Sequence, residues 1–124
     1  MMLGVLPAVL FWLSLLPGLT GEKPVSENTE VLVHLEIIPD SVNVIKATLR
    51  VKKGTPARDL MNRLFQMDYA DWRKTFVTGI AGFHADGRRR QFWALSVDGK
   101  PSQVGIAEIT INQPVHIRWQ IQTY

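Results

Sequence analysis

The chain has 124 residues, no cysteine, 46% hydrophobic residues and a formal net charge of +3 at pH 7. This length suits one small domain, and the lack of cysteine excludes disulfide stabilisation and thiol catalysis. The small net charge argues against a nucleic-acid partner, which would need a basic face with interleaved aromatic residues.

The first 21 residues contain no charged side chain, whereas all 14 basic and 11 acidic residues follow Gly21. The apolar run MLGVLPAVLFWLSLL is short and is interrupted by Pro7. Such a run is typical of a secretory signal peptide rather than of a membrane span. We therefore predict a signal peptide over residues 1–21, with a retained anchor or a buried helix as alternatives. The cleaved protein is expected to be secreted and extracellular, without a membrane segment.

Residues 22–30 (EKPVSENTE) are polar and predict a flexible lead-in to the domain, which is expected over residues 31–124. Residues 31–37 (VLVHLEI) and 44–52 (VIKATLRVK) each alternate between apolar and polar side chains. This period of two predicts two half-buried strands joined as a hairpin.

A helix is predicted after the second strand. Thr55 is the expected N-cap and Pro56 occupies the first helical position. Asp59 lies in the first turn, where the positive end of the helix dipole stabilises a negative charge. Apolar residues recur at spacings of three and four, which indicates one stripe facing a sheet. We expect the helix to run to about Gln66 or Asp68.

Three more strand signals follow. Residues 72–83 (WRKTFVTGIAGF) contain β-formers broken by two glycines, which indicates a strand with a bulge or a close approach. Residues 91–97 form the next predicted strand, which turns at Asp98-Gly99, and residues 115–121 alternate up to the C-terminus. The order of elements predicts an α+β fold, a β-grasp-like mixed sheet packed on one helix.

The sequence offers little for catalysis, so we predict that the protein is not an enzyme. His34 and His116 are expected to approach each other on the polar face if the first and last strands are neighbours. A metal site there lacks a third ligand at suitable spacing, so two half-exposed imidazoles are the simpler interpretation. The basic run Arg88–Arg90 is interpreted as a solvated loop, with a polyanion patch or a processing site as alternatives.

Tryptophan and phenylalanine side chains are more informative. Phe92 and Trp93 are adjacent in a predicted strand, so they must point to opposite faces. One of them belongs to the core, and the other either faces a ligand or is covered by another part of the domain.

Several segments resemble the C-terminal β-domain of the cobalamin carriers, the family of intrinsic factor, transcobalamin and haptocorrin. They are QFWALS from Gln91, GIAE from Gly105 and the closing IRW and QTY, with a twelve-residue step from Trp93 to Gly105. The VDGKPS turn also resembles the wider family, and the similarity covers about Glu30 to Tyr124.

In these carriers a helical barrel and the β-domain hold the corrinoid between them. The resemblance implies that Trp93 and Leu95 pack on the corrin rim, that Ser96 and hairpin backbone groups bind its amide side chains, and that Trp119 stays in the core. The implied cobalamin-binding residues are Trp72, Thr75, Phe76, Val77, Trp93, Ala94, Leu95, Ser96, Val97, Asp98, Gly99, Lys100, Pro101 and Ser102.

The sequence and the resemblance together predict a secreted binding protein for cobalamin or a related corrinoid. No enzymatic cofactor and no metal are expected. Because the helical barrel is missing, a lone β-domain offers half a pocket, and we expect weak affinity unless a protein partner completes the site. The alternative is a secreted protein-interaction module that keeps the fold and uses the edge from Trp93 to Ser102, or the loop Arg88–Arg90, against a protein.

Overall fold

The computed structural model describes residues 29–124. The predicted signal peptide over residues 1–21 and residues 22–28 of the predicted lead-in, which was placed over residues 22–30, lie outside the described residues. Within the described part, residues 31–124 form one compact unit. No helix in that part is both long and apolar enough to span a membrane.

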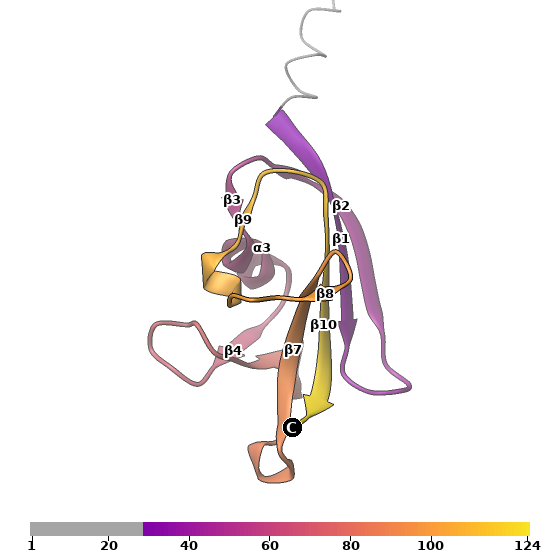
Figure 1. The fold of residues 1–124 in the computed structure, drawn as a ribbon, viewed down its shortest axis with the longest axis vertical. Helices are drawn as coiled ribbons and strands as arrows, with labels where there is room; N and C mark the ends of the chain where they lie inside the picture. The colour runs from indigo at the N-terminus through magenta and orange to yellow at the C-terminus, as the bar shows by residue number, and fades with distance from the viewer. Residues whose placement is uncertain (1–28) are drawn as a thin grey trace, which may run out of the picture. The chain divides into compact units, whose positions relative to one another are not determined.

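The main sheet has five strands in the order β2-β1-β10-β7-β8. The strands are β1 (Glu30–Ile38), β2 (Ile45–Lys52), β7 (Gln91–Val97), β8 (Lys100–Pro101) and β10 (Val115–Thr123). β1 pairs with β10 in parallel, and β10 pairs with β7 antiparallel, so the sheet is mixed as predicted. Figure 1 shows β2, β1, β10 and β7 side by side, with α3 (Ala57–Leu64) to one side of them.

Alternation along β1 and β10 places the core on one face of the sheet. Val33, Leu35 and Ile37 of β1 are buried there, together with Ile117 and Trp119 of β10. The polar residues between them lie on the opposite face, which we call the open face. The predicted α+β class is confirmed, and the last strand is held because it lies between two neighbours.

The helix is shorter than predicted and begins differently. Its N-cap is Pro56 without a side-chain hydrogen bond, while the Thr55 hydroxyl donates to the Lys52 carbonyl at 2.6 Å. The helix ends at Leu64 because Phe65 adopts an extended backbone and Met67–Tyr69 form a short strand, β4. The predicted extension to Gln66 or Asp68 is therefore wrong.

The single strand predicted over residues 72–83 is also wrong. β5 (Val77–Ile80) and β6 (Phe83–His84) form a small sheet with β4, in the order β4-β5-β6. Gly79 of β5 lies under the Asp68–His84 pair, and a Cβ atom there would approach His84 Cδ2 to 2.6 Å. The expectation was that another backbone or a ligand comes close to a glycine here, whereas the close neighbours of Gly79 are side chains of the same small sheet.

The remaining elements are short. They are two 3-10 helices, η3 (Gly87–Arg89) and η4 (Ile106–Glu108), and the paired strands β3 (Thr55–Pro56) and β9 (Thr110–Ile111). Asp98 and Gly99 between β7 and β8 have φ values of 51° and 84°. Positive φ at both central residues is the geometry that Asp-Gly favours, so the predicted tight turn is confirmed.

Candidate functional site

A small cavity lies on the core face of the sheet beside β7 and β10. We call it the Trp93 cavity, and its volume is about 130 Å³. Three separate segments and the central strand β10 contribute its lining: Thr75, Phe76, Val77, Trp93, Leu95, Val104, Gly105, Ile106 and Trp119. No charged side chain is among these residues, so the cavity suits an uncharged, largely apolar group.

The cavity is built on core residues, and four of its lining residues are exposed: Thr75, Phe76, Val104 and Gly105. Trp93 is only 6% exposed and Trp119 only 3%, so both tryptophans belong to the core. Phe76 is 58% exposed and Val104 is 43% exposed. A ligand at the mouth therefore meets Phe76 and Val104 before it reaches the indole rings.

Both tryptophans also carry an unpaired donor. The indole N–H groups of Trp93 and Trp119 are buried and have no hydrogen-bond partner among the described residues. Most buried polar groups in proteins are paired, because leaving one unpaired costs about 1–3 kcal/mol. Both residues line the cavity, but the donor atoms themselves are buried inside the core.

Asp71 holds the segment that leads to Phe76. Its Oδ1 accepts from the backbone N–H groups of Thr75 at 3.0 Å and Phe76 at 2.9 Å, and its Oδ2 accepts from the Thr75 hydroxyl. Hydrogen bonds from the Thr75 hydroxyl and the Phe76 amide lower the pKa of Asp71 to about 2. The exposed phenylalanine is thus fixed by a carboxylate that stays ionised well into the acid range.

The hairpin that follows Trp93 is fixed in a similar way. Asp98 Oδ1 accepts from the His116 backbone N–H at 2.9 Å, which ties the turn to β10. The Ser102 backbone N–H donates to the Leu95 carbonyl at 2.9 Å, and the Ser102 hydroxyl donates to the Val104 carbonyl at 2.6 Å. Ser102 therefore positions Val104 at the mouth of the cavity.

The structure brings together only part of the predicted cobalamin site. Thr75, Phe76 and Val77 meet Trp93 and Leu95 at the cavity, although their segments are separated in sequence. The other residues of the predicted set do not line it: Trp72, Ala94, Ser96, Val97, Asp98, Gly99, Lys100, Pro101 and Ser102.

The structure places two of these residues apart from the cavity. Trp72 lies in the loop before β5 and is 87% exposed, with the Arg73 guanidinium carbon 5.5 Å from its ring centroid. Ser96 pairs with Arg118 across β10 and β7, which puts it on the open face, whereas Leu95 pairs with the core residue Trp119. Ser96 and Leu95 thus cannot contact one small ligand from the same side.

Val104 and Ile106 were missed because their segment has no strand-like period. The available indication was the GIAE segment of the resemblance, which includes Gly105 and Ile106 but gave neither a role in a site. A Cβ atom on Gly105 would lie 3.8 Å from the Thr75 carbonyl oxygen.

A second hollow of about 150 Å³ adjoins the first through Phe76 and Val77, which line both. Phe92 and Tyr124 contribute to it, with ring centroids 5.9 Å apart. The Arg90 Nε donates to the Tyr124 carbonyl at 2.9 Å, and its guanidinium lies over the Tyr124 ring. One arginine of the basic run is therefore used to hold the C-terminus.

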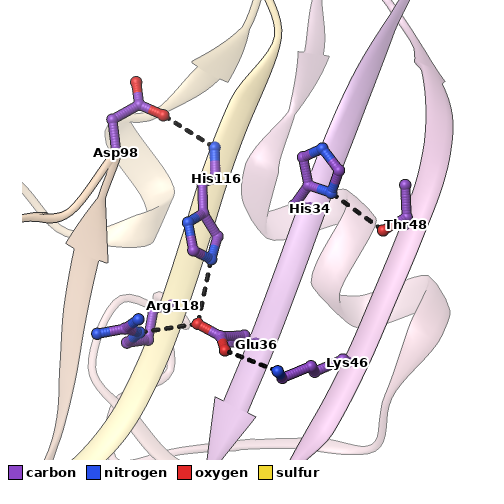
Figure 2. A network of polar contacts seen from close by, with 7 residues as sticks. All are labelled: His34, Glu36, Lys46, Thr48, Asp98, His116 and Arg118. Atoms are coloured by element: carbon purple, nitrogen blue, oxygen red, sulfur yellow. Dashed lines mark hydrogen bonds and ion pairs between the residues drawn. The ribbon is translucent and has the colours of Figure 1, made fainter.

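The open face carries a polar network centred on Glu36 (Figure 2). Oε1 of Glu36 accepts from Nε2 of His116 at 3.1 Å and from Nε of Arg118 at 2.9 Å, and Lys46 Nζ lies 3.7 Å from Oε2. The hydrogen bond from Arg118 is the main cause that lowers the pKa of the Glu36 carboxyl. One carboxylate is thus shared by three cationic or ionisable neighbours.

The predicted approach of the two histidines is confirmed. His34 pairs with His116 in the register of β1 and β10, and their ring centroids are 6.4 Å apart. His34 Nδ1 lies 3.0 Å from the Thr48 hydroxyl oxygen (Figure 2). Among the described residues, no group of three or more histidine, aspartate or glutamate side chains could hold a metal ion.

Comparison with known proteins supports the fold. The similarity to haptocorrin, whose structure was solved in complex with Cbi, has a TM-score of 0.63 and 17% sequence identity. It covers 78% of this chain and 26% of the haptocorrin chain, so this chain spans about a quarter of that protein. At this identity the likeness shows the fold alone, and at that level the predicted resemblance to the cobalamin carriers is confirmed.

A second similar structure is a "putative metal binding protein" from Ruminococcus gnavus ATCC 29149. The TM-score is 0.62 with 10% identity, over 76% of this chain and 98% of that one. No curated protein matches the chain in sequence. The family model described as "Domain of unknown function (DUF4430)" matches residues 54–123. Since this match covers more than half of the chain, the chain belongs to the DUF4430 family.

Proposed function

We propose that the protein is a non-enzymatic binding domain that holds one edge of a corrinoid such as cobalamin at the Trp93 cavity. The observation that carries this proposal is the cavity itself, where Thr75–Val77 and the strand residues Trp93 and Leu95 meet. The resemblance in sequence implies these two segments as ligand-facing, and they come together from different elements. The similar fold of haptocorrin in complex with Cbi supports the same ligand class.

The size of the cavity determines how much of a corrinoid it holds. Sites that enclose a small-molecule ligand have volumes of roughly 300–1,000 Å³, whereas this one has about 130 Å³. The cavity therefore accepts a projecting edge or side chain, and the rest of the macrocycle stays outside. A protein partner that covers the exposed part would supply the missing half of the site.

The chemistry of the lining fits the same ligand. Phe76 and Val104 offer apolar contact at the mouth, and the indole N–H groups of Trp93 and Trp119 are donors without partners among the described residues. A corrinoid presents an apolar ring edge and amide carbonyls. The apolar ring edge fits the apolar mouth of the cavity.

Titration of the purified protein with cyanocobalamin tests the proposal, by calorimetry because corrinoid absorbance distorts fluorescence. We expect saturable one-to-one binding in the micromolar range or weaker. Phe76→Ala is expected to weaken binding about tenfold, since contact with a phenylalanine side chain contributes on the order of 1.5–3 kcal/mol when fully buried.

Val104→Ala and Val44→Ala form a matched pair, because both valines are exposed and only Val104 lines the cavity. We expect Val104→Ala to weaken binding and Val44→Ala to leave it unchanged. Absence of binding at millimolar cyanocobalamin would contradict the proposal. Equal effects of the two valine variants would place the ligand elsewhere on the molecule.

We further propose that the protein is secreted, as the apolar segment over residues 1–21 predicts. Expression of the full chain in cells with a secretory pathway, followed by sequencing of the mature N-terminus, tests this. A product in the medium that begins near Glu22 supports secretion, whereas a cell-associated product that begins at Met1 contradicts it.

A further inference from the structure

The outer edge of β2 has no neighbouring strand in the described structure. β2 ends the strand order, so within residues 29–124 only its inner edge is paired, with β1 (Figure 1). A free strand edge presents a row of backbone N–H and C=O groups that another strand can pair with. β2 thus has the backbone geometry to accept a sixth strand.

The side chains beside this edge are also uncovered on the core face. The core-facing residues of β1 are fully buried, whereas Ile45, Ala47 and Leu49 of β2 are only partly buried. Leu64 at the end of α3 is 41% exposed. The core face of β1 is therefore covered, whereas part of the same face of β2 is open.

A hollow of about 290 Å³ lies between β2 and α3. We call it the β2 groove, and its lining combines leucines with three cations: Leu49, Arg50, Val51, Lys52, Thr55, Leu60, Arg63 and Leu64. No carboxylate is among these residues. Leu49 and Val51 face the groove from β2, and Arg63 is the cation that α3 brings to it, whereas the side chains of Arg50 and Lys52 alternate to the opposite face of the strand.

The charges determine which strand can pair here. Lys46, Arg50 and Lys52 alternate along β2 and share its open face. Two copies of β2 paired with each other would bring these cations into proximity, and like charges across a strand pair are destabilising. Cations on an edge strand thus protect against self-pairing, but they do not account for the apolar groove beneath.

We propose that the edge of β2 binds an extended acidic segment of a protein partner, which adds to the sheet as a sixth strand. Alternate side chains of that segment would point to opposite faces. Acidic residues on one face would pair with Arg50 and Lys52, and apolar residues on the other would enter the β2 groove. This inference is independent of the proposed corrinoid function, because the Trp93 cavity is lined by other residues.

A capped peptide of alternating glutamate and valine residues, as long as β2, is a direct probe. We expect saturable binding to the full protein that weakens as salt is raised, together with slower amide hydrogen exchange in β2. The same peptide with lysine in place of glutamate should not bind. A peptide with N-methylated backbone groups on its pairing edge should also fail to bind, because it cannot form the ladder.

Two matched pairs of variants locate the peptide. Arg50→Glu should weaken binding at least about tenfold, while Arg88→Glu, an exposed arginine in η3, should not. Leu64→Ala removes apolar surface from the groove, whereas Leu32→Ala removes a leucine of similar exposure, 38%, on the open face. We expect weaker binding for the first leucine variant only.

The proposal is overturned if the acidic peptide does not bind, or if the N-methylated peptide binds equally well. It is likewise overturned if Arg50→Glu and Arg88→Glu have the same effect, since charge attraction would then be unspecific. All four variants change exposed side chains, and circular dichroism verifies that each remains folded.

Discussion

The Trp93 cavity and the β2 groove both expose apolar side chains, but their surroundings differ in charge. The cavity is lined only by uncharged residues, whereas the groove is bordered by Arg50, Lys52 and Arg63. Exposed apolar area alone would not distinguish the kinds of ligand that the two regions bind. The charge around that area indicates an uncharged amphipathic ligand for the first and an acidic chain for the second.

The two regions also differ in how their apolar groups are held. Phe76 and Val104 lie on loops fixed by side-chain hydrogen bonds, since Asp71 accepts from the Phe76 backbone N–H and the Ser102 hydroxyl donates to the Val104 carbonyl. The groove residues lie on a strand and a helix that the core itself supports. Changes at the cavity rim should therefore alter binding without altering the fold, while changes deeper in the cavity should alter both.

The largest effect is expected for Trp93→Ala, which tests whether the base of the cavity is also the core. Because Trp93 is 6% exposed, the change should lower the free energy of unfolding by about 3–5 kcal/mol. Urea denaturation measures this loss, with Phe76→Ala as the control that stays close to the wild type. If Trp93→Ala lowered the free energy of unfolding only slightly, Trp93 would line the cavity without being needed for the stability of the core.

Glu36→Gln should have a smaller effect and reports on the open face near β2. Its carboxylate is shared by Arg118, His116 and Lys46, so the change should cost on the order of 1 kcal/mol, as expected for partly exposed ion pairs. The folded-state pKa of Glu36 is lowered, so its contribution is present at neutral pH and is lost as the pH falls below the unfolded-state value of about 4.3.

Urea denaturation of the wild type and Glu36→Gln at several pH values checks this dependence. The difference in unfolding free energy should shrink as the pH is lowered from about 6 toward the acid range. A difference that stays constant would show that the charge of Glu36 is not the cause.

Asp71→Ala should act locally at the cavity rim. The amides of Thr75 and Phe76 lose their acceptor, so we expect faster hydrogen exchange there and several-fold weaker cyanocobalamin binding. In the wild type the Asp71 carboxyl resonance should titrate near pH 2 instead of 3.8. The rim contact is therefore intact above pH 3.8 and is lost as the pH falls toward 2. An ordinary titration midpoint would show that the contact is weak in solution.

Much of the sheet could be predicted from the sequence because alternation is a local property. It identified β1, β2 and β10, and the pairing of first and last strands placed His34 beside His116. The turn at Asp98-Gly99 was predictable because a tight hairpin turn needs two consecutive residues with positive φ, and Asp-Gly is one of the few pairs that adopt this geometry readily. By contrast, β4 has only three residues, so its pattern could not be told from the end of the helix.

The candidate site was harder to predict because it depends on which face of each strand is covered. Alternation required Phe92 and Trp93 to face opposite sides, but only tertiary packing decides that Trp93 is the core residue. Val104 and Ile106 reach the cavity through a loop without periodicity. Long-range packing of this kind leaves no pattern in a single sequence.

The smallest effect is expected for Trp72→Ala, and it decides how far the ligand extends from the cavity. Trp72 is 87% exposed and does not line the cavity, so the free energy of unfolding should change by less than about 0.5 kcal/mol. The affinity for cyanocobalamin, measured by calorimetry, should stay within about twofold of the wild type. A clear loss of affinity at unchanged stability would mean that the macrocycle leaves the cavity on the side of Trp72. The region that a partner must cover would then include the loop that Asp71 holds.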